Sequence, residues 1–338
     1  MNIKTLGIDI AKNIFQVHGV DYAGKQVINK PIRRNKLLEF INQLPPCLIG
    51  MEACSGSNYW GQKFTKMGHE VKLISPQFVK PYVKSNKNDA VDAEAICEAV
   101  TRPSMRFVAI KNKEQQDIQS IHKVRTRLVK EKTALTNQIR GLLHEYGIII
   151  PQGISYVMSE LPLILEDADN ELTSYSRELF KDLYMQLKNT SLKVGEYDQQ
   201  IENICTNNPL CKLVCKLPGI GPLTATALIA LIGNIKIFKN GRELSAYLGL
   251  VPKQHSSGGK TRLLGISKRG DRYVRCLLIH GARAALFRAK NLPTSKANWL
   301  KELILRRGFN RTVVALANKN ARTIWAIMTK GEEFVWNT

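Results

Sequence analysis

The chain has 338 residues, of which 44% are hydrophobic and 23% charged, and its formal net charge is +22. This length is sufficient for two or three domains with buried cores, while no apolar run reaches the ~18 residues that a membrane-spanning helix requires. Seven scattered cysteines do not form a disulfide scaffold. We therefore expect a cytoplasmic protein with no signal peptide and no membrane partner.

The positive charge is concentrated in the C-terminal part of the chain. Residues 242–338 contain 19 Lys and Arg against 5 Asp and Glu, so they carry +14 of the net charge of +22. Such a local excess indicates a polyanionic partner, and nucleic acid is the obvious one. A membrane surface is the weaker alternative, because no long basic amphipathic helix with an aromatic face is present.

The first 105 residues predict a mixed α/β unit in which antiparallel strands are followed by alternating strands and helices. Apolar runs bounded by turn residues indicate the strands, and helical patterns closed by Gly or Pro indicate the helices. In chain order we expect strands at 3–10, 14–20 and from 25, a helix at 35–44, a strand at 47–52, a helix at 59–67, a strand at 71–74 and a helix at 89–100.

Four acidic residues lie at the ends of these elements. Asp9 and Glu52 each end a predicted strand, and Asp89 and Asp92 are spaced i,i+3 on one face of the following helix. Converging carboxylates repel one another unless cations lie between them, and hard oxygen ligands suit Mg²⁺ or Mn²⁺. Two such ions about 3.5–4 Å apart can bind both oxygens of a phosphoryl displacement. The sequence therefore predicts that these four acids are metal ligands and catalytic residues.

Each acid taken alone also has a structural interpretation. Asp9 could be a turn residue, Glu52 could simply end a strand, and Asp89 could cap the helix that starts there. The order of the four, strand–Asp, hairpin, strand–Glu and then DxxD on a helix, matches the ribonuclease-H-like fold of nucleases and transposases. Asp21, in a turn, and Glu94, off the shared helix face, are poorer candidates.

Residues 112–208 predict two long helices joined by the region 151–162. A heptad seam runs along the first helix, interrupted at Arg125 and Lys132, and an apolar stripe runs along the second. Two interpretations fit these stripes equally well. One is packing within a helical hairpin, and the other is a coiled-coil arm that dimerises. The seam consists of Ile118, Ile121, Leu128, Leu135, Ile139 and Leu142, and the stripe of Val194, Tyr197, Ile201 and Ile204.

The segment LPGIG at 217–221, followed by PLTATALIALIG, is similar to a helix-hairpin-helix element. In such an element the backbone N–H groups of a glycine turn and of the next helix hold a DNA phosphate. Gly219 and Gly221 would supply the backbone freedom. The alternative is a tight turn between helices that binds no ligand.

A basic, glycine-rich stretch, GLVPKQHSSGGKTRLLGISKRG, occupies residues 249–270 and contains no acid. Loops of this composition usually bind phosphate, and the guanidinium and ammonium groups of this one can hold phosphate oxygens and offset developing charge. The predicted contacts are Lys260, Arg262, Lys268 and Arg269. The adjacent serines raise the question of whether the loop only binds nucleic acid or also attacks it.

Together these motifs resemble the DEDD-type insertion-sequence transposases, the bridge-RNA-guided serine recombinase family related to the pilin-inversion recombinase Piv. The segments GIDIAK (7–12), NDAVDAEAI (88–96) and the SSGG block carry most of the resemblance, which extends over essentially the whole chain. One departure is CSGSNYW after Glu52, where members vary, and it removes no catalytic group. The resemblance implies a RuvC/ribonuclease-H-like DEDD domain at 1–111 and a coiled-coil helical arm at 112–208. It implies a mostly helical C-terminal transposase domain, with the helix-hairpin-helix-like element and a catalytic serine, at 209–338.

The resemblance also implies a mechanism. Members carry a nucleophilic serine just ahead of a glycine in this loop, which corresponds to Ser257 before Gly258 and not to Ser256. A serine hydroxyl is a weak nucleophile until a base or a metal takes its proton, and Mg²⁺ (or Mn²⁺) on the acids could do this. His255 could be a proton shuttle, although a loop histidine near phosphate is more often a simple contact.

The partners that the resemblance implies are donor and target DNA and a structured guide RNA encoded by the mobile element. The RNA would pair with both DNAs and choose the sites, while the protein recognises shape and backbone, as in another RNA-guided system. The protein itself would be a homo-oligomer, a dimer that forms a tetramer in the synaptic complex.

Two other functions fit the same residues. A metal-dependent nuclease of the Holliday-junction type would use the four acids and water, with Ser257 only gripping phosphate. A non-catalytic nucleic-acid-binding scaffold would carry an inactive ribonuclease-H-like domain, and the intact acid quartet argues against it.

Overall fold

The computed structural model describes residues 2–84, 88–288 and 294–331. The chain divides into two compact units, one of residues 1–115 with 232–237 and one of residues 116–231 with 238–338. We describe each unit by itself. The predicted division into three domains at 111 and 208 stays a prediction.

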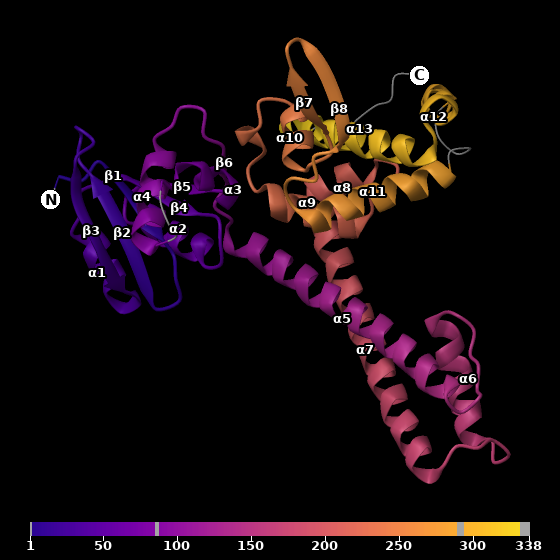
Figure 1. Ribbon diagram of the computed structural model, residues 1–338. Coiled ribbons are helices and arrows are strands. Elements are labelled where there is room, and N and C mark those ends of the chain that lie inside the picture. The colour runs from indigo at the N-terminus through magenta and orange to yellow at the C-terminus, as the bar shows by residue number, and fades with distance from the viewer. Residues whose placement is uncertain (1, 85–87, 289–293, 332–338) are drawn as a thin grey trace. The chain divides into compact units, whose positions relative to one another are not determined.

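The first unit is built on a six-stranded mixed sheet with the order β3-β2-β1-β4-β5-β6 (Figure 1). β1 pairs antiparallel with β2 and parallel with β4, and β4 pairs parallel with β5. β1 is therefore a central strand, and its residues Thr5–Ile8 are buried, as expected for a strand covered on both faces. The strands are β1 (Thr5–Asp9), β2 (Ile14–Val20), β3 (Gln26–Arg33), β4 (Leu48–Glu52), β5 (Glu70–Ile74) and β6 (Phe107–Val108).

Helices surround this sheet at the positions that the sequence predicts. The predicted strands and helices of residues 1–105 are all present, so the predicted mixed α/β unit is confirmed. The short elements β6, α3 and η1 are additions to the prediction. The helices are α1 (Arg34–Asn42), α2 (Ser57–Lys66), α3 (Pro76–Val79), η1 (Lys80–Tyr82) and α4 (Asp89–Val100), with η2 (Ile235–Ile237) contributed by a later segment.

Two glycines let α4 lie directly on the sheet. A Cβ on Gly7 of β1 would be 2.2 Å from the carbonyl oxygen of Ala93, and a Cβ on Gly50 of β4 would be 2.8 Å from the Cβ of Val100. Both distances are shorter than van der Waals contact, so only glycine fits at either place. The first turn of α4 is thereby held near the carboxyl ends of β1 and β4.

The second unit contains a helical arm. Its helices are α5 (Lys113–His144), α6 (Ile154–Glu166) and α7 (Ser174–Asn207). α5 and α7 are the two long helices that the sequence predicts, and α6 lies against them at one end of the arm (Figure 1). The three share one apolar core that includes Ile139, Leu161 and Phe180.

The region 151–162 is not the simple connection that the sequence predicts, because α6 forms there and includes Pro162. Proline has no N–H to donate to the carbonyl of Met158 one turn earlier. The hydroxyl of Tyr184 in α7 donates to that carbonyl instead, over 3.5 Å. Tertiary packing thus compensates for the proline.

Most of the predicted seam is buried within the chain. Ile118, Leu128, Leu135 and Ile139 are buried, whereas Ile121 and Leu142 are half-buried. On α7, Val194 and Ile201 are buried, and Tyr197 and Ile204 are half-buried. Both stripes are therefore largely covered within the single chain, and oligomerisation stays a prediction.

The remainder of the second unit is mostly helical, as predicted. The exception is a hairpin of β7 and β8, where the sequence predicts a loop. α13 packs against α8, α10, α11 and α12 and is the centre of this region. The elements are α8 (Pro209–Cys215), α9 (Pro222–Ile232), α10 (Gly241–Tyr247), β7 (Pro252–Ser257), β8 (Lys260–Ile266), α11 (Arg272–Phe287), α12 (Thr294–Arg307) and α13 (Phe309–Lys330).

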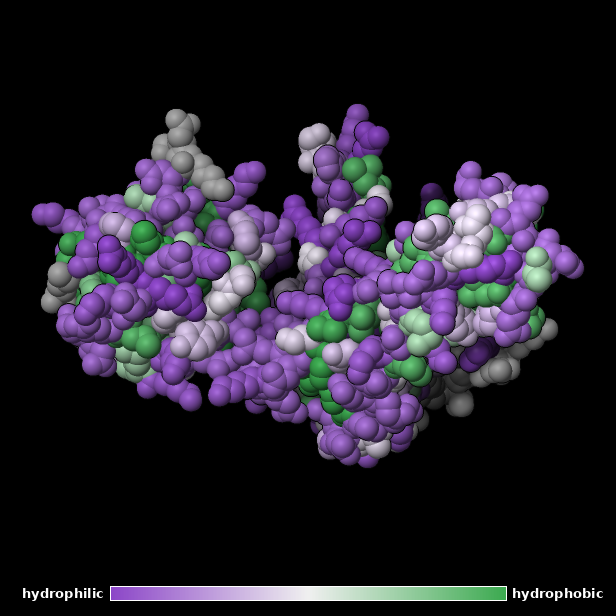
Figure 2. All heavy atoms as spheres, turned by 90° about the horizontal axis from the view of Figure 1, so that it is seen from below, coloured by the Kyte–Doolittle hydropathy of each residue, from purple (hydrophilic) through white to green (hydrophobic). Residues whose placement is uncertain are grey.

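Hydrophilic side chains cover most of the face seen in Figure 2, in keeping with the net charge of +22. Within the described ranges, no helix combines the length and the apolar character needed to cross a bilayer.

Candidate functional site

The carboxyl ends of β1 and β4 bring the first two acids to one edge of the sheet. The parallel register pairs Ile8 with Met51, so Asp9 and Glu52 follow side by side. Both side chains are half-buried.

Asp89 and Asp92 both lie in the first turn of α4. The side chain of Asn88 caps this helix by accepting a hydrogen bond from the backbone N–H of Ala90 at 3.0 Å. The interpretation of Asp89 as the helix cap is therefore wrong. Negative charge in the first turn is favoured by the helix dipole, which offsets part of the repulsion between the two carboxylates.

Three of the four acids converge. Carboxylate oxygens of Asp9, Asp89 and Asp92 all lie within 4.8 Å of one another. Three negative charges at this distance repel strongly unless a cation lies between them. The donors are all hard oxygens, and the site is partly open to solvent, so the residues fit Mg²⁺ or Mn²⁺, which keep several waters when bound to proteins.

Glu52 does not belong to that group of three, but its charge acts on the same place. The exposed thiol of Cys54 senses both strand-end acids. Loss of water around its sulfur raises the pKa of Cys54, and the carboxylates of Glu52 and Asp9 raise it further. The negative potential of the ends of β1 and β4 therefore extends to Cys54, in the loop after Glu52.

The two acids that the sequence ranks lower have other roles. The carboxylate of Asp21 accepts hydrogen bonds from the backbone N–H groups of Ala23 and Lys25, both at 2.9 Å, so it organises the β2–β3 turn. Glu94 forms an ion pair with Lys84 at 3.5 Å. Neither is among the three acids whose carboxylates converge.

The serine stretch forms a β-hairpin and not a loop. β7 and β8 pair antiparallel and are joined by Gly258 and Gly259, whose φ angles are +54° and +76°. Two successive positive φ values suit the tight turn that matches the twist of a hairpin, and glycine adopts them without strain. Ser257 is the last residue of β7 and is exposed at the tip of the hairpin.

The register gives the hairpin two chemically different faces. Directly paired residues point to the same face of a two-stranded ribbon. Ser257 pairs with Lys260, and His255 pairs with Arg262. Alternation along β7 puts Ser257 and His255 on one face, so this serine shares its face with a histidine and two cations.

Ser256 belongs to the opposite face. It pairs with Thr261, and the side-chain amide of Gln254 donates to its hydroxyl oxygen at 2.9 Å. Among the directly paired residues of the hairpin, none on the face of Ser256 is a base or a cation. This geometry favours Ser257 over Ser256 as the reactive serine.

The base of the hairpin is fixed by a buried arginine. Arg275 of α11 is 7% exposed. Its Nη1 atom donates to backbone carbonyls of Leu248, Arg269, Gly270 and Asp271 at 3.1–3.5 Å. The side chains of Lys268, which has a φ of +55°, and of Arg269 remain exposed beside this anchor. The segment can therefore present cations while its backbone is held in place.

The LPGIG turn joins α8 to α9, and its two glycines differ. Gly219 has a φ of +84°, and a Cβ there would be 2.3 Å from the carbonyl oxygen of Gly281 in α11. Packing between backbones thus explains Gly219. Gly221 is exposed and has open space around it. Phosphate binding by the turn stays a prediction.

Sequence reasoning missed Gly7 and Gly50, which position the acids, and Arg275, which positions the hairpin. Glycine inside a buried strand is a recognisable sign of a close backbone approach. The guanidinium of Arg275 leaves no comparable sign, because an arginine on a basic helix predicts exposure.

Comparison with known proteins decides the family. A model described as the IS116/IS110/IS902 transposase family matches residues 211–299, which include the LPGIG turn and the hairpin. A second model, of DEDD transposases of the IS110 type, matches residues 6–148, which include all four acids. The transposase for insertion sequence element IS1111A of Coxiella burnetii is 49% identical over 98% of this chain and 92% of its own length. The chain belongs to the IS110/IS116 family of DEDD-type transposases.

Other relatives of this transposase family align along nearly the whole chain. A probable family 20 transposase of Pseudomonas aeruginosa is 45% identical over 98% of both chains. The transposase for insertion sequence element IS1328 of Yersinia enterocolitica is 39% identical over 98% of this chain and 99% of its own. The resemblance drawn from the motifs is therefore confirmed at the level of the family.

Proposed function

We propose that this transposase cuts and rejoins donor and target DNA through a phosphoserine intermediate at Ser257, supported by metal-bound acids. Membership of the family makes an insertion sequence the DNA concerned. The observation that carries the proposal is the convergence of Asp9, Asp89 and Asp92 within 4.8 Å, a spacing that suits cations and phosphate oxygens.

The acids would hold Mg²⁺ or Mn²⁺ at the edge of the sheet. Asp9, Asp89 and Asp92 would bind one ion, and Glu52, beside Asp9, would share a second. When bound, such an ion supplies positive charge that offsets the charge on phosphoryl oxygens and lowers the pKa of a nearby hydroxyl. The protein's own part is to hold the carboxylates rigidly, which Gly7 and Gly50 permit.

The serine step forms one bond and breaks one bond. The Ser257 oxygen attacks phosphorus, the bond from phosphorus to a deoxyribose oxygen breaks, and the freed strand end takes a proton. His255 shares the face of Ser257 and could accept the serine proton. Lys260 and Arg262, on the same face, would hold the phosphate oxygens as charge develops. After strand exchange, a hydroxyl end attacks the phosphoserine and Ser257 takes its proton back.

The acids and Ser257 belong to different compact units, so the proposal requires both to reach the same phosphodiester. They could do so within one subunit or between two subunits of a dimer or tetramer. We propose that Lys268, Arg269 and Gly221 contact nucleic-acid backbones. We also propose that a structured guide RNA from the mobile element pairs with both DNAs, as the resemblance to the bridge-RNA-guided family implies.

A second candidate is a metal-dependent nuclease in which water replaces the serine. The acids alone favour it, because they assemble within one unit without any residue of the hairpin. In that case Ser257 would only grip phosphate, and no protein–DNA bond would form.

A covalent-adduct experiment separates these functions. The protein is incubated with Mg²⁺, the end DNA of the insertion sequence and the RNA transcribed from it, and is then separated in denaturant. We expect wild type to form a stable protein–DNA adduct that Ser257→Ala and Asp9→Ala abolish. DNA cleavage by Ser257→Ala without any adduct would support the nuclease instead.

A further inference from the structure

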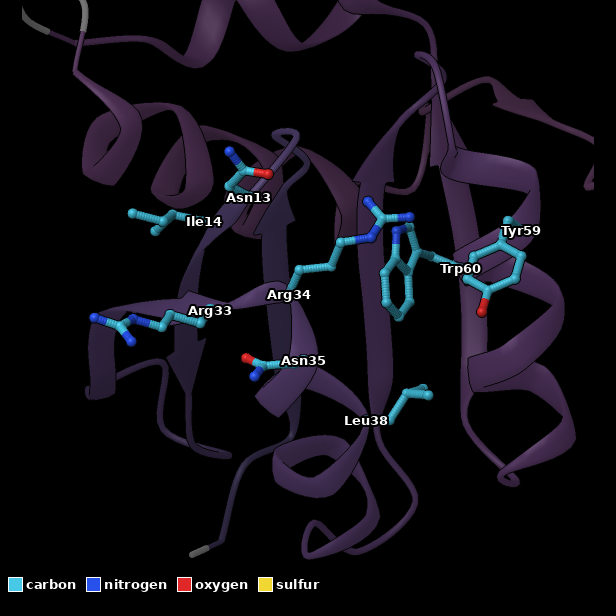
Figure 3. A pocket seen from close by; sticks show the side chains of 8 residues that line it. All are labelled: Asn13, Ile14, Arg33, Arg34, Asn35, Leu38, Tyr59 and Trp60. Carbon is cyan, nitrogen blue, oxygen red and sulfur yellow. The ribbon is translucent and has the colours of Figure 1, made fainter.

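A groove of about 630 Å³ lies in the first unit and is not used by the proposed chemistry (Figure 3). Tyr59 and Trp60 of α2 contribute aromatic surface, and Arg33 and Arg34, where β3 meets α1, contribute two guanidinium groups. No acidic residue is among those that line it in the described part of the chain. Aromatic surface beside guanidinium groups is the combination that binds a base and its phosphate.

Arg34 is held in place before any ligand arrives. Its guanidinium lies by the Trp60 ring (Figure 3). The distance to the centre of that ring is 5.2 Å, and the distance to the centre of the Phe15 ring is 6.0 Å. Its Nη1 atom also donates to the carbonyl of Lys12 at 3.3 Å. A guanidinium fixed on an aromatic ring presents a flat cationic surface on which a base can stack.

Trp60 carries an unused donor at the same place. Its side chain is 3% exposed, and its indole Nε1 has no hydrogen-bond partner among the described residues. A Cβ on Gly56 would be 4.0 Å from this nitrogen, so the donor lies next to the loop that follows Glu52. This nitrogen is buried, so it belongs to the floor of the groove and is not open to a ligand in this structure.

The groove and the acids lie at the same edge of the sheet. Asn13, in the groove, is four residues after Asp9, and four residues of chain span at most about 14 Å. Tyr59 follows Glu52 through the loop that begins α2. A DNA strand with a phosphate at the acids would therefore bring a neighbouring nucleotide to the groove.

We propose that this groove binds one unpaired nucleotide of the DNA strand whose phosphodiester lies at the acids. The base would stack on the exposed ring of Tyr59 near the Arg34 guanidinium, and Arg33, which is exposed, would contact the phosphate. Stacking on a side chain requires a free face of the base, so the base must leave its pair. Which DNA strand supplies the nucleotide is inferred from the proposed function. That the ligand is a nucleotide is inferred from the residues that line the groove.

The test uses Ser257→Ala protein with Ca²⁺, so that binding is measured without any strand cleavage. Single-stranded end DNA carrying 5-iododeoxyuridine at one position at a time is irradiated, and the crosslinked peptide is identified. We expect crosslinks to Tyr59, the exposed ring of the groove. We also expect Tyr59→Ala to weaken binding of the oligonucleotide at least about fivefold, and Tyr59→Phe to retain it.

Matched controls separate the groove from general surface effects. Tyr22→Ala removes an exposed tyrosine of the same unit, and Lys36→Ala removes a positive charge of α1 outside the groove. Both should bind normally, while Arg33→Ala should bind more weakly. Equal losses of oligonucleotide binding in target and control variants would overturn the proposal. Crosslinks to residues outside the groove would also overturn it, and so would preferential crosslinking of an RNA of the same sequence. A failure of the serine chemistry alone would leave these results unchanged.

Discussion

Gly7 and Ala93 meet backbone to backbone: a Cβ on Gly7 would be 2.2 Å from the Ala93 carbonyl oxygen and 2.5 Å from the backbone nitrogen of Cys97. This contact fixes the distance between β1, which ends in Asp9, and α4, which begins with Asp89 and Asp92. The acid cluster thus depends on a residue that touches no substrate.

Gly7→Ala should move α4 away from β1 and separate the carboxylates. We expect a loss of about 1–3 kcal/mol in the free energy of unfolding, because overpacking against backbone has few ways to relax. We also expect weaker binding of Mg²⁺, measured by titration calorimetry. Gly195→Ala, in an open part of α7, is the matched control and should raise stability by up to about 1 kcal/mol. Equal behaviour of the two variants would contradict the role given to Gly7.

Removal of one negative charge from the acid cluster should raise thermal stability in the absence of metal and should reduce the stabilisation that metal gives. Without divalent cations, Asp92→Asn should melt at a higher temperature than wild type, because like-charge repulsion is relieved. With millimolar Mg²⁺, wild type should gain stability by mass action and the variant should gain less. Glu39→Gln, an exposed acid paired with Lys36, should leave the Mg²⁺ response intact. A Mg²⁺ response that is the same in all three proteins would exclude a metal site at these acids.

His122 should make stability depend on pH. It is buried between the hydroxyls of Tyr273 and Thr226, each 3.0 Å away, and burial together with the nearby Arg125 lowers its pKa from 6.5 to about 4. Between these values the unfolded chain binds more protons than the folded one, so stability falls as pH falls from about 6.5 to about 4. The expected loss is roughly 3 kcal/mol.

Urea unfolding at several pH values from 4.5 to 7.5 measures this effect. Other groups also titrate in acid, so the informative quantity is the difference between wild type and His122→Gln. The variant should lose less stability than wild type as the pH falls. Parallel curves for the two proteins would show that His122 is not responsible.

The acids were predictable from the sequence, and the hairpin was not. Asp9, Glu52, Asp89 and Asp92 follow apolar runs or open a helix, so their positions at element ends could be inferred from periodicity alone. β7 and β8 are almost wholly exposed, so neither has the alternation of apolar and polar residues that marks a half-buried strand. Only the Gly258–Gly259 pair indicated a two-residue turn.

Interactions between distant segments explain the other differences. Pro162 ordinarily predicts the end of a helix, and it is accommodated because Tyr184, 22 residues later, bonds the carbonyl that the proline leaves free. His122 looks like a polar residue beside the predicted seam, and it is buried because α9 and α11 supply its partners. Neither partner can be found from local sequence.

The most direct test of the central claim is the identity of the residue bonded to DNA. The adduct is trapped in denaturant, digested with nuclease and protease, and analysed by tandem mass spectrometry. The account predicts a residual nucleotide on Ser257, and a normal yield of adduct from Ser256→Ala. A nucleotide on Ser256, or cleaved DNA with no nucleotide on any serine of the hairpin, would contradict it.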